Sequence, residues 1–121
     1  MSEKQPWGYS LLLDCKGGNI SSITDPDNIT NFTDALVKAI DMKAYGPTIL
    51  EHFATHDPDK AGYSMVQLIE TSNMTAHFVD KNGDFYVDIF SCKPFEVSVA
   101  EHIVDYYFQP KKIDTTFVYR G

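Results

Sequence analysis

Apolar residues recur between residues 30 and 42 with the period of an α-helix. One face carries the positions i, i+3, i+4, i+7 and i+8, which are Phe32, Ala35, Leu36, Ala39 and Ile40. A second helix is expected to begin at Pro94, a residue that suits a first turn, and to end at Pro110. Its apolar face consists of Ala100, Ile103, Val104, Tyr107 and Phe108. Two helices with one apolar face each predict that a sheet lies beneath them.

Six short apolar runs, bounded by turn residues, predict β-strands. They span residues 7–14, 48–55, 63–70, 74–79, 84–91 and 113–120. The pair Asn82-Gly83 is a strong hairpin signal, and the turn-rich residues 16–28 are expected to separate the first strand from the first helix. Strands joined mostly by hairpins predict one α+β domain over residues 1–121. We expect a two-layer sandwich in which both main helices cover one face of an antiparallel sheet.

The second face of this sheet has no helix to cover it. An antiparallel sheet can leave one face to solvent, but the sheet of a second copy, related by a twofold axis, would cover it. A homodimer is therefore expected.

Composition narrows the classes of function. The chain has 121 residues, of which 43% are hydrophobic, and this is enough for one core. Its net charge of -7 argues against binding nucleic acid by phosphate neutralisation and favours small molecules or proteins as partners. No apolar run approaches the ~20 residues that span a bilayer, and residues 1–6 lack the pattern of a secretory leader. We therefore expect a cytoplasmic protein without a membrane partner.

The two cysteines, Cys15 and Cys92, are too few for a disulfide framework and are expected to be free thiols. They do not form a metal-binding spacing with the scattered histidines. No metal is therefore expected.

Groups capable of covalent chemistry are concentrated between residues 62 and 92. They are Ser64, Ser72, His77 and Cys92. A hairpin that turns at Asn82-Gly83 brings the start of one strand beside the end of the next. This pairing places Ser72 opposite Ser91, Cys92 or Lys93. Ser72 and Cys92 are therefore expected to be neighbours in one chain.

Ser64 and His77 are expected to lie far from Ser72 in the same subunit. Ser64 precedes Ser72 by eight residues, which is about 26 Å in a chain extended at ~3.3 Å per residue. His77 follows Ser72 by five residues, about 16 Å away and on the opposite face of a strand. Unless the chain turns near Ser72, both residues can reach it only from the other subunit of a dimer.

Several segments resemble one known family. They are Gly62-Tyr63-Ser64, then Ser72, then His77 five residues later, then Asp88-Ile89-Phe90-Ser91-Cys92, with weaker similarity at Trp7-Gly8, His56 and Arg120-Gly121. In sequence and spacing these segments resemble the small bacterial and archaeal form of S-adenosylmethionine decarboxylase. That enzyme is a pyruvoyl-dependent lyase that serves spermidine and other polyamine synthesis. The resemblance covers most of the chain.

The resemblance implies that the chain is a proenzyme that cleaves itself between Thr71 and Ser72. Ser72 would become a pyruvoyl group, which binds the substrate amine as a Schiff base and accepts the electrons of decarboxylation. Ser64 and His77 of the partner subunit would assist the cleavage. Cys92 would return a proton to the substrate, since a thiol with a reference pKa of about 8.5 is largely protonated at neutral pH.

The residues near Ser72 also depart from the family pattern. Thr71 stands where the family usually has Glu, with Glu70 one residue earlier, and Asn73 replaces a His. Lys81 replaces the Glu that holds the ribose hydroxyls of the substrate, and an ammonium cannot accept their hydrogen bonds. Substrate-binding candidates are therefore His56, Asp80 and Glu70. In addition, Lys93 replaces the Gly that follows the family's Cys.

Three hypotheses follow from this pattern. The first is an S-adenosylmethionine decarboxylase, and the second is the same fold and cofactor acting on ornithine or arginine, cations that an acidic chain does not repel. The third is a homologue that never cleaves and serves as a binding or regulatory subunit.

Overall fold

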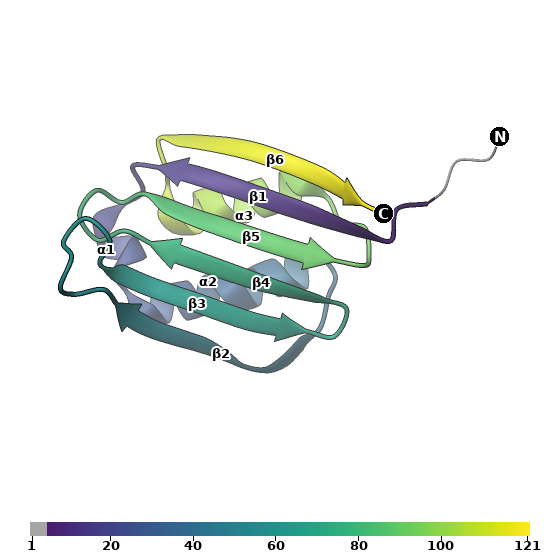
Figure 1. Ribbon diagram of the computed structural model, residues 1–121, viewed down its shortest axis with the longest axis horizontal. Coiled ribbons are helices and arrows are strands. Elements are labelled where there is room, and N and C mark those ends of the chain that lie inside the picture. The colour runs from purple at the N-terminus through teal and green to yellow at the C-terminus, as the bar shows by residue number, and fades with distance from the viewer. Residues whose placement is uncertain (1–4) are drawn as a thin grey trace.

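A computed structural model describes residues 5–121, and residues 1–4, part of the segment inspected for a leader, lie outside the described residues. Six strands form one sheet in the order β2-β3-β4-β5-β1-β6, and every neighbouring pair is antiparallel. The elements in chain order are β1 (Gly8–Lys16), α1 (Ile20–Ile23), α2 (Pro26–Ala39), β2 (Ala44–Phe53), β3 (Gly62–Ile69), β4 (Ser72–Phe78), β5 (Phe85–Ser91), α3 (Val97–Phe108) and β6 (Lys112–Arg120). Figure 1 shows α2 and α3 together behind one face of the sheet. The predicted α+β sandwich is confirmed.

Helix α2 begins earlier than the apolar stripe predicted. The Asp25 carboxylate accepts hydrogen bonds from the backbone N–H groups of Asp27 and Asn28, at 3.0 and 3.3 Å, and Pro26 occupies the first turn. The expectation that residues 16–28 form only a loop was wrong, because Asp-Pro-Asp here is a helix start and not a turn. The short helix α1 also lies within this segment.

Two further boundaries differ from the prediction. Helix α3 begins at Val97, three residues after Pro94. Strand β2 begins at Ala44 and continues through Gly46-Pro47, where its pairing with β3 shifts register. A proline is tolerated there because β2 is an edge strand whose outer N–H groups have no partner to lose.

Alternate strand residues face opposite sides of the sheet. The helix face, the side that α2 and α3 cover, contains residues that are less than a tenth exposed, among them Leu11, Leu13, Met65, Met74, Phe78, Phe85, Val87 and Ile89. The open face, the opposite side, contains Leu12, Ser64, Leu68, Thr75, His77, Tyr86, Asp88 and Val118. Phe108 of α3 packs on Phe78 and Phe85 of the helix face, at ring-centroid distances of 5.1 and 5.0 Å.

The hairpin between β4 and β5 fixes the register that positions Ser72. Gly83 has φ +80°, and a Cβ atom there would lie 2.2 Å from the carbonyl oxygen of Gly18. Only glycine fits both conditions. Of the helices among residues 5–121, none is long and apolar enough to cross a membrane.

Candidate active site

Ser72 is the first residue of β4 and lies where a tight turn leaves β3. It pairs with Ile69 across that turn and with Ser91 on the other side. The predicted pairing of Ser72 with the end of β5 is therefore confirmed. Thr71, the residue before Ser72, lies in the turn and is exposed.

Cys92 contacts the carbonyl oxygen of Thr71, which belongs to the peptide bond that precedes Ser72. The backbone N–H of Cys92 donates to this oxygen at 3.1 Å, and its thiol Sγ donates at 3.2 Å. Two donors aimed at one carbonyl oxygen polarise it and stabilise the negative charge that develops when a nucleophile adds to the carbonyl carbon. The sequence indicated that Cys92 is near Ser72, but it did not indicate this contact.

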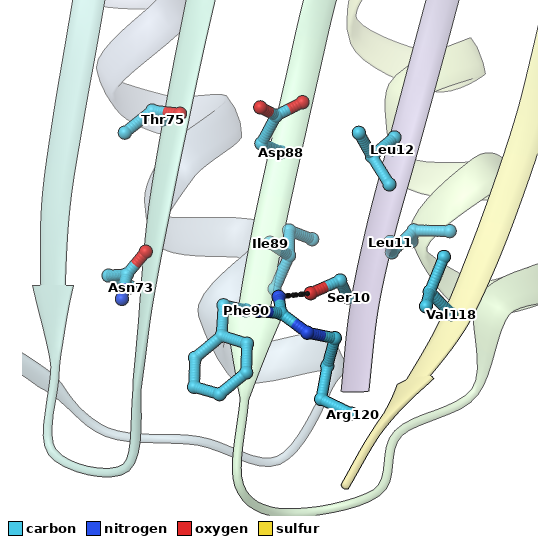
Figure 2. A pocket seen from close by; sticks show the side chains of 10 residues that line it. All are labelled: Ser10, Leu11, Leu12, Asn73, Thr75, Asp88, Ile89, Phe90, Val118 and Arg120. Atoms are coloured by element: carbon cyan, nitrogen blue, oxygen red, sulfur yellow. Dashed lines mark hydrogen bonds between the residues drawn. The ribbon is translucent and has the colours of Figure 1, made fainter. Parts of the chain in front are cut away.

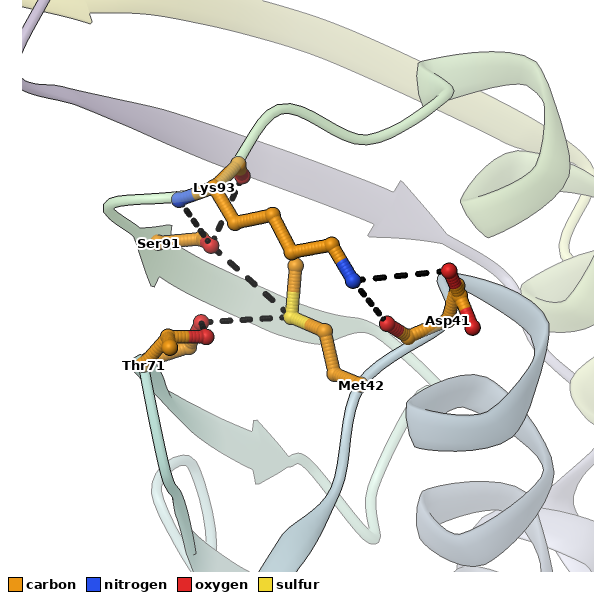
Figure 3. Close-up of polar contacts among 6 residues, drawn as sticks. Asp41, Met42, Thr71, Ser91 and Lys93 are labelled. Carbon is orange, nitrogen blue, oxygen red and sulfur yellow. Dashed lines mark hydrogen bonds and ion pairs between the residues drawn. The ribbon is translucent and has the colours of Figure 1, made fainter.

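The Ser72 hydroxyl lies on the helix face, against Met42. Its Oγ donates to the Met42 Sδ at 3.2 Å and lies 3.3 Å from the Thr71 hydroxyl. The buried Ser91 hydroxyl is 3.8 Å from the same sulfur. Figure 3 shows Met42 between Thr71, just before β4, and Ser91, at the end of β5, with Lys93 extending toward Asp41. Sequence reasoning missed Met42, because no local motif marks a contact between residues 30 positions apart.

Ser64 and His77 contact each other on the open face. Ser64 Oγ lies 2.8 Å from His77 Nδ1, and His77 Nε2 lies 3.1 Å from the carbonyl oxygen of Lys60. A carbonyl can only accept, so Nε2 carries a proton, and in the neutral imidazole Nδ1 then accepts from the Ser64 hydroxyl. This arrangement selects the tautomer that a neutral His77 adopts beside the serine hydroxyl.

The chain does turn beside Ser72, yet Ser64 and His77 stay away from it. The turn pairs Ser64 with His77, which is five residues along β4 from Ser72, about 16 Å at ~3.3 Å per residue. Within one subunit, the structure therefore brings Ser72 to Cys92 and Ser64 to His77, but does not join these two pairs.

Two hollows lie on the open face and share Thr75 and Asp88 as lining residues. The larger, of about 420 Å³, adjoins the Ser72 end of the sheet, because its lining includes Asn73 and the paired Phe90. Figure 2 shows Arg120 reaching across it to Ser10, with Nη1 2.8 Å from the serine hydroxyl. The smaller hollow, of about 280 Å³, is lined by the Ser64 and His77 pair and by Tyr86.

Asp88 is the acidic group that lines both hollows. Desolvation raises the pKa of the Asp88 carboxyl, and the nearby negative charge of Asp14 raises it further. A carboxylate in this position attracts a cationic group. Sequence reasoning used Asp88 only as part of the motif that ends at Cys92.

The three substrate-binding candidates lie away from both hollows. Glu70 is exposed, with its carboxylate 3.9 Å from the Lys43 ammonium. Asp80 contacts His52 at 2.6 Å. His56 is exposed in the connection between β2 and β3. None of the three lines either of these two hollows.

Lys81, the residue at the family's acidic position, forms an ion pair with Asp59 at 2.5 Å. The hydrogen bond between the two side chains, together with their opposite charges, raises the pKa of Lys81 and lowers the pKa of Asp59. Both side chains are exposed, so the pair contributes little to stability.

The two thiols lie in different environments. Cys15 is buried, and desolvation together with Asp14 and Asp114 raises its pKa to about 12. Cys92 is exposed. Within residues 5–121, no three His, Cys, Asp or Glu side chains are grouped as a metal site requires.

The fold and this strand end define a two-layer α+β domain in which a serine follows a peptide carbonyl that accepts two hydrogen bonds from Cys92. The model of the S-adenosylmethionine decarboxylase family matches residues 9–121, and the chain belongs to this family. The crystal structure of the adenosylmethionine decarboxylase from Aquifex aeolicus VF5 is similar to this chain with a TM-score of 0.81 and 21% sequence identity. That similarity covers 98% of this chain and 93% of the other, and at this identity it concerns the fold alone. A search of curated protein sequences finds no match.

Proposed function

We propose that this chain is a self-processing, pyruvoyl-dependent S-adenosylmethionine decarboxylase of polyamine synthesis, with Ser72 as the pyruvoyl precursor. The observation that carries the proposal is the Thr71 carbonyl oxygen, which accepts hydrogen bonds from both the N–H and the thiol of Cys92. A peptide bond polarised in this way, next to a serine hydroxyl, is prepared for attack by that hydroxyl. Membership of the decarboxylase family supports the same assignment.

The self-processing reaction uses groups of this chain. Ser72 Oγ adds to the Thr71 carbonyl carbon, the C–N bond breaks, and the amide nitrogen takes the hydroxyl proton, which gives an ester. A base then removes the Ser72 Cα proton, and the Cβ–O bond breaks with release of the Thr71 carboxylate. Water finally replaces the nitrogen as ammonia, which leaves a keto group at residue 72. These steps consume one water and need no oxidant.

The residues around Ser72 fit the resulting group. A pyruvoyl group supplies an electron sink for decarboxylation when it is present. Cys92 Sγ, 3.2 Å from the Thr71 carbonyl oxygen, is placed to deliver a proton at this strand end. The carboxylate of Asp88 in the adjoining hollow favours a substrate with a positive charge, as the sulfonium of S-adenosylmethionine has.

The open face supports a dimer in which each subunit completes the other's site. Suppose that the open faces of two subunits pack against each other, with a twofold axis between them that is perpendicular to β4 and passes near Thr75. Because β4 spans residues 72–78 and Thr75 is at its middle, this axis reverses the strand. The Ser72 end of β4 in one subunit then faces the His77 end of β4 in the other. The Ser64 and His77 pair, with a fixed acceptor at Nδ1, would then act on the partner's Thr71–Ser72 bond.

A basic amino acid is the second candidate substrate. In the loop that the family uses for the ribose hydroxyls, Asp80 is paired with His52 and Lys81 with Asp59. Those internal pairs leave fewer acceptors for a ribose, whereas Asp88 suits the ammonium or guanidinium of ornithine or arginine as well as a sulfonium.

Intact-mass measurement of purified protein tests the proposal. We expect fragments of residues 1–71 and 72–121, and we expect Ser72→Ala to stay whole. The processed protein should then release carbon dioxide from S-adenosylmethionine, with ornithine and arginine as comparison substrates. A wild-type chain that remains whole and does not react with carbonyl reagents would overturn the proposal and favour a binding or regulatory subunit.

Two further variants separate the roles of the site residues. Cys92→Ala keeps the backbone N–H that donates to the Thr71 carbonyl, so it should still cleave, but it should lose most decarboxylation. His77→Ala and Ser72→Ala chains should process poorly alone, whereas mixed refolding should restore cleavage of the His77→Ala chain. In that heterodimer one site combines an intact Ser72 with the intact His77 of the other chain. Cleavage of neither chain in confirmed heterodimers would place the whole site within one subunit.

A further inference from the structure

The segment that connects α2 to β2, residues 40–43, lies against the Thr71–Ser72 bond on the helix face. The Ser72 Oγ is 3.2 Å from the sulfur of Met42, which is half-buried against the core. This distance leaves no space for a water molecule between the two atoms. The thioether is a weak acceptor and otherwise an apolar cover.

Hydrogen bonds to two neighbouring segments hold residues 40–43 in place. On one side, the Glu70 N–H donates to the Lys43 carbonyl at 3.1 Å. On the other, the Lys93 ammonium donates to the Asp41 backbone carbonyl and lies 3.4 Å from its carboxylate. The residues on both sides of Met42, Asp41 and Lys43, are therefore each held by a hydrogen bond. Lys43 is bonded to Glu70, which precedes Thr71, and Asp41 is bonded to Lys93, which follows Cys92.

Lys93 makes a contact that the family's glycine at this position cannot make. A glycine has no side chain, so the hydrogen bond from the Lys93 ammonium to Asp41 is a property of this chain. Asp41 has φ +59°, a left-handed conformation that is uncommon outside glycine, although Asp adopts it more readily than most residues. The bond from Lys93 to its carbonyl is one contact that supports this conformation.

The cover matters because the ester in the proposed self-processing has two fates. Elimination gives the pyruvoyl end and ammonia. Hydrolysis instead adds water to the ester carbonyl, breaks its C–O bond, and leaves residue 72 as an ordinary serine with a free amine. The two products compete only while the ester exists, so exclusion of water from the ester until elimination has occurred decides how much active enzyme forms.

We propose that Met42 covers the Ser72 oxygen against water and thereby directs processing to elimination, with Lys93 as a positioning residue that acts through Met42. This inference rests on the proposed self-processing. Its readout is the N-terminus of the 72–121 fragment, because a pyruvoyl end and a serine end differ in mass by one ammonia.

The experiment compares that N-terminus among purified proteins by intact mass. Met42→Ala removes the cover and should raise the ratio of serine ends to pyruvoyl ends about tenfold, which corresponds to about 1.4 kcal/mol between the two barriers. Lys93→Ala should also raise the ratio of serine ends to pyruvoyl ends, but by less than Met42→Ala does. Met42→Leu keeps the volume and should behave as wild type, because the cover and not the sulfur excludes water. Lys112→Ala removes an exposed lysine of β6 and is the matched control for the loss of one charge.

The outcomes distinguish this inference from the proposed function. If wild type cleaves and both Met42→Ala and Lys93→Ala keep its ratio of ends, the role of Met42 and Lys93 is overturned while self-processing stands. If wild type stays whole, the proposed function fails, and this inference fails with it. Lys93 is on the surface, so Lys93→Ala remains informative even if Met42→Ala does not fold.

Discussion

The two faces of the sheet are built from the same strands but lie in different surroundings. Leu11 and Val87 on the helix face are 0% exposed, whereas Leu12 on the open face is 36% exposed. Leu68 and Val118, also on the open face, are 50% and 40% exposed. Because a strand directs alternate side chains to opposite sides, one residue step separates a core position from a surface position. The helix face stabilises the subunit, whereas the apolar residues of the open face stay exposed in the single chain, as the proposed dimer requires.

The proposed chemistry is divided between these two faces. The Ser72 hydroxyl lies with Met42 on the helix face, while Ser64 and His77 lie on the open face. In the proposed dimer, groups on the helix face and groups on the open face meet at the Thr71–Ser72 peptide bond, because this bond lies at the start of β4. This division explains why a single subunit contains all four candidate residues without joining them.

The largest predicted difference is between Cys15 on the buried helix face and Cys92 at the exposed end of β5. With a pKa of about 12, only about one part in ten thousand of Cys15 is thiolate at about pH 8, and its burial blocks the reagent as well. Iodoacetamide should therefore modify Cys92 and leave Cys15 unmodified in the native protein, as read by peptide mass. In urea both cysteines should react. Modification of Cys15 at the rate of Cys92 under native conditions would contradict the buried helix face.

Truncation of an aromatic residue should have a large effect on the helix face and a small one on the open face. Phe78 is 0% exposed and stacks on Phe85, so Phe78→Ala should lower the free energy of unfolding by about 3–5 kcal/mol. Phe53 on the open face is 54% exposed, and Phe53→Ala should cost no more than about 0.5 kcal/mol in the monomer. Urea unfolding at concentrations that keep the protein monomeric measures both values. Equal losses would remove the distinction between the faces.

A charge on the open face should break association without unfolding the subunit. Leu68→Arg places a guanidinium where the partner sheet would pack, and its desolvation should weaken the dimer at least about tenfold. Tyr106→Arg, at a residue of α3 that is 69% exposed, is the control outside this face. Analytical ultracentrifugation gives the dimer constants, and circular dichroism confirms the fold. A dimer that tolerates Leu68→Arg would have to use another surface.

The smallest predicted effect is the pH dependence contributed by Asp88. Its pKa is raised by burial and by Asp14, so its protonated form stabilises the folded state below the ordinary value of 3.8, and this contribution is lost as pH rises through the raised pKa. Asp88→Asn stays neutral and should raise the melting temperature near neutral pH by no more than a few degrees. Below the ordinary pKa the variant and wild type should melt alike. A gain that is the same at every pH would point to a cause other than this ionisation.

Local sequence patterns determined much of the fold. The Asn82-Gly83 hairpin fixed the pairing of Ser72 with Ser91, because a turn type sets the register of the strands that it joins. The apolar stripes located both main helices and the face that they bury. The start of α2 was missed because Asp25-Pro26 has the composition of both a turn and a helix cap, and only the side-chain hydrogen bonds distinguish the two.

The contacts around the reactive serine depended on the tertiary structure. Met42 reaches Ser72 across 30 residues and Lys93 reaches Asp41 across 52. Likewise, the contact of Cys92 Sγ with the Thr71 carbonyl arises only because β5 ends beside the start of β4. Periodicity and turn chemistry are encoded by neighbours in the chain, so they can be recognised in the sequence. Contacts between distant segments depend on how all the elements pack together, and no short stretch of sequence contains that information.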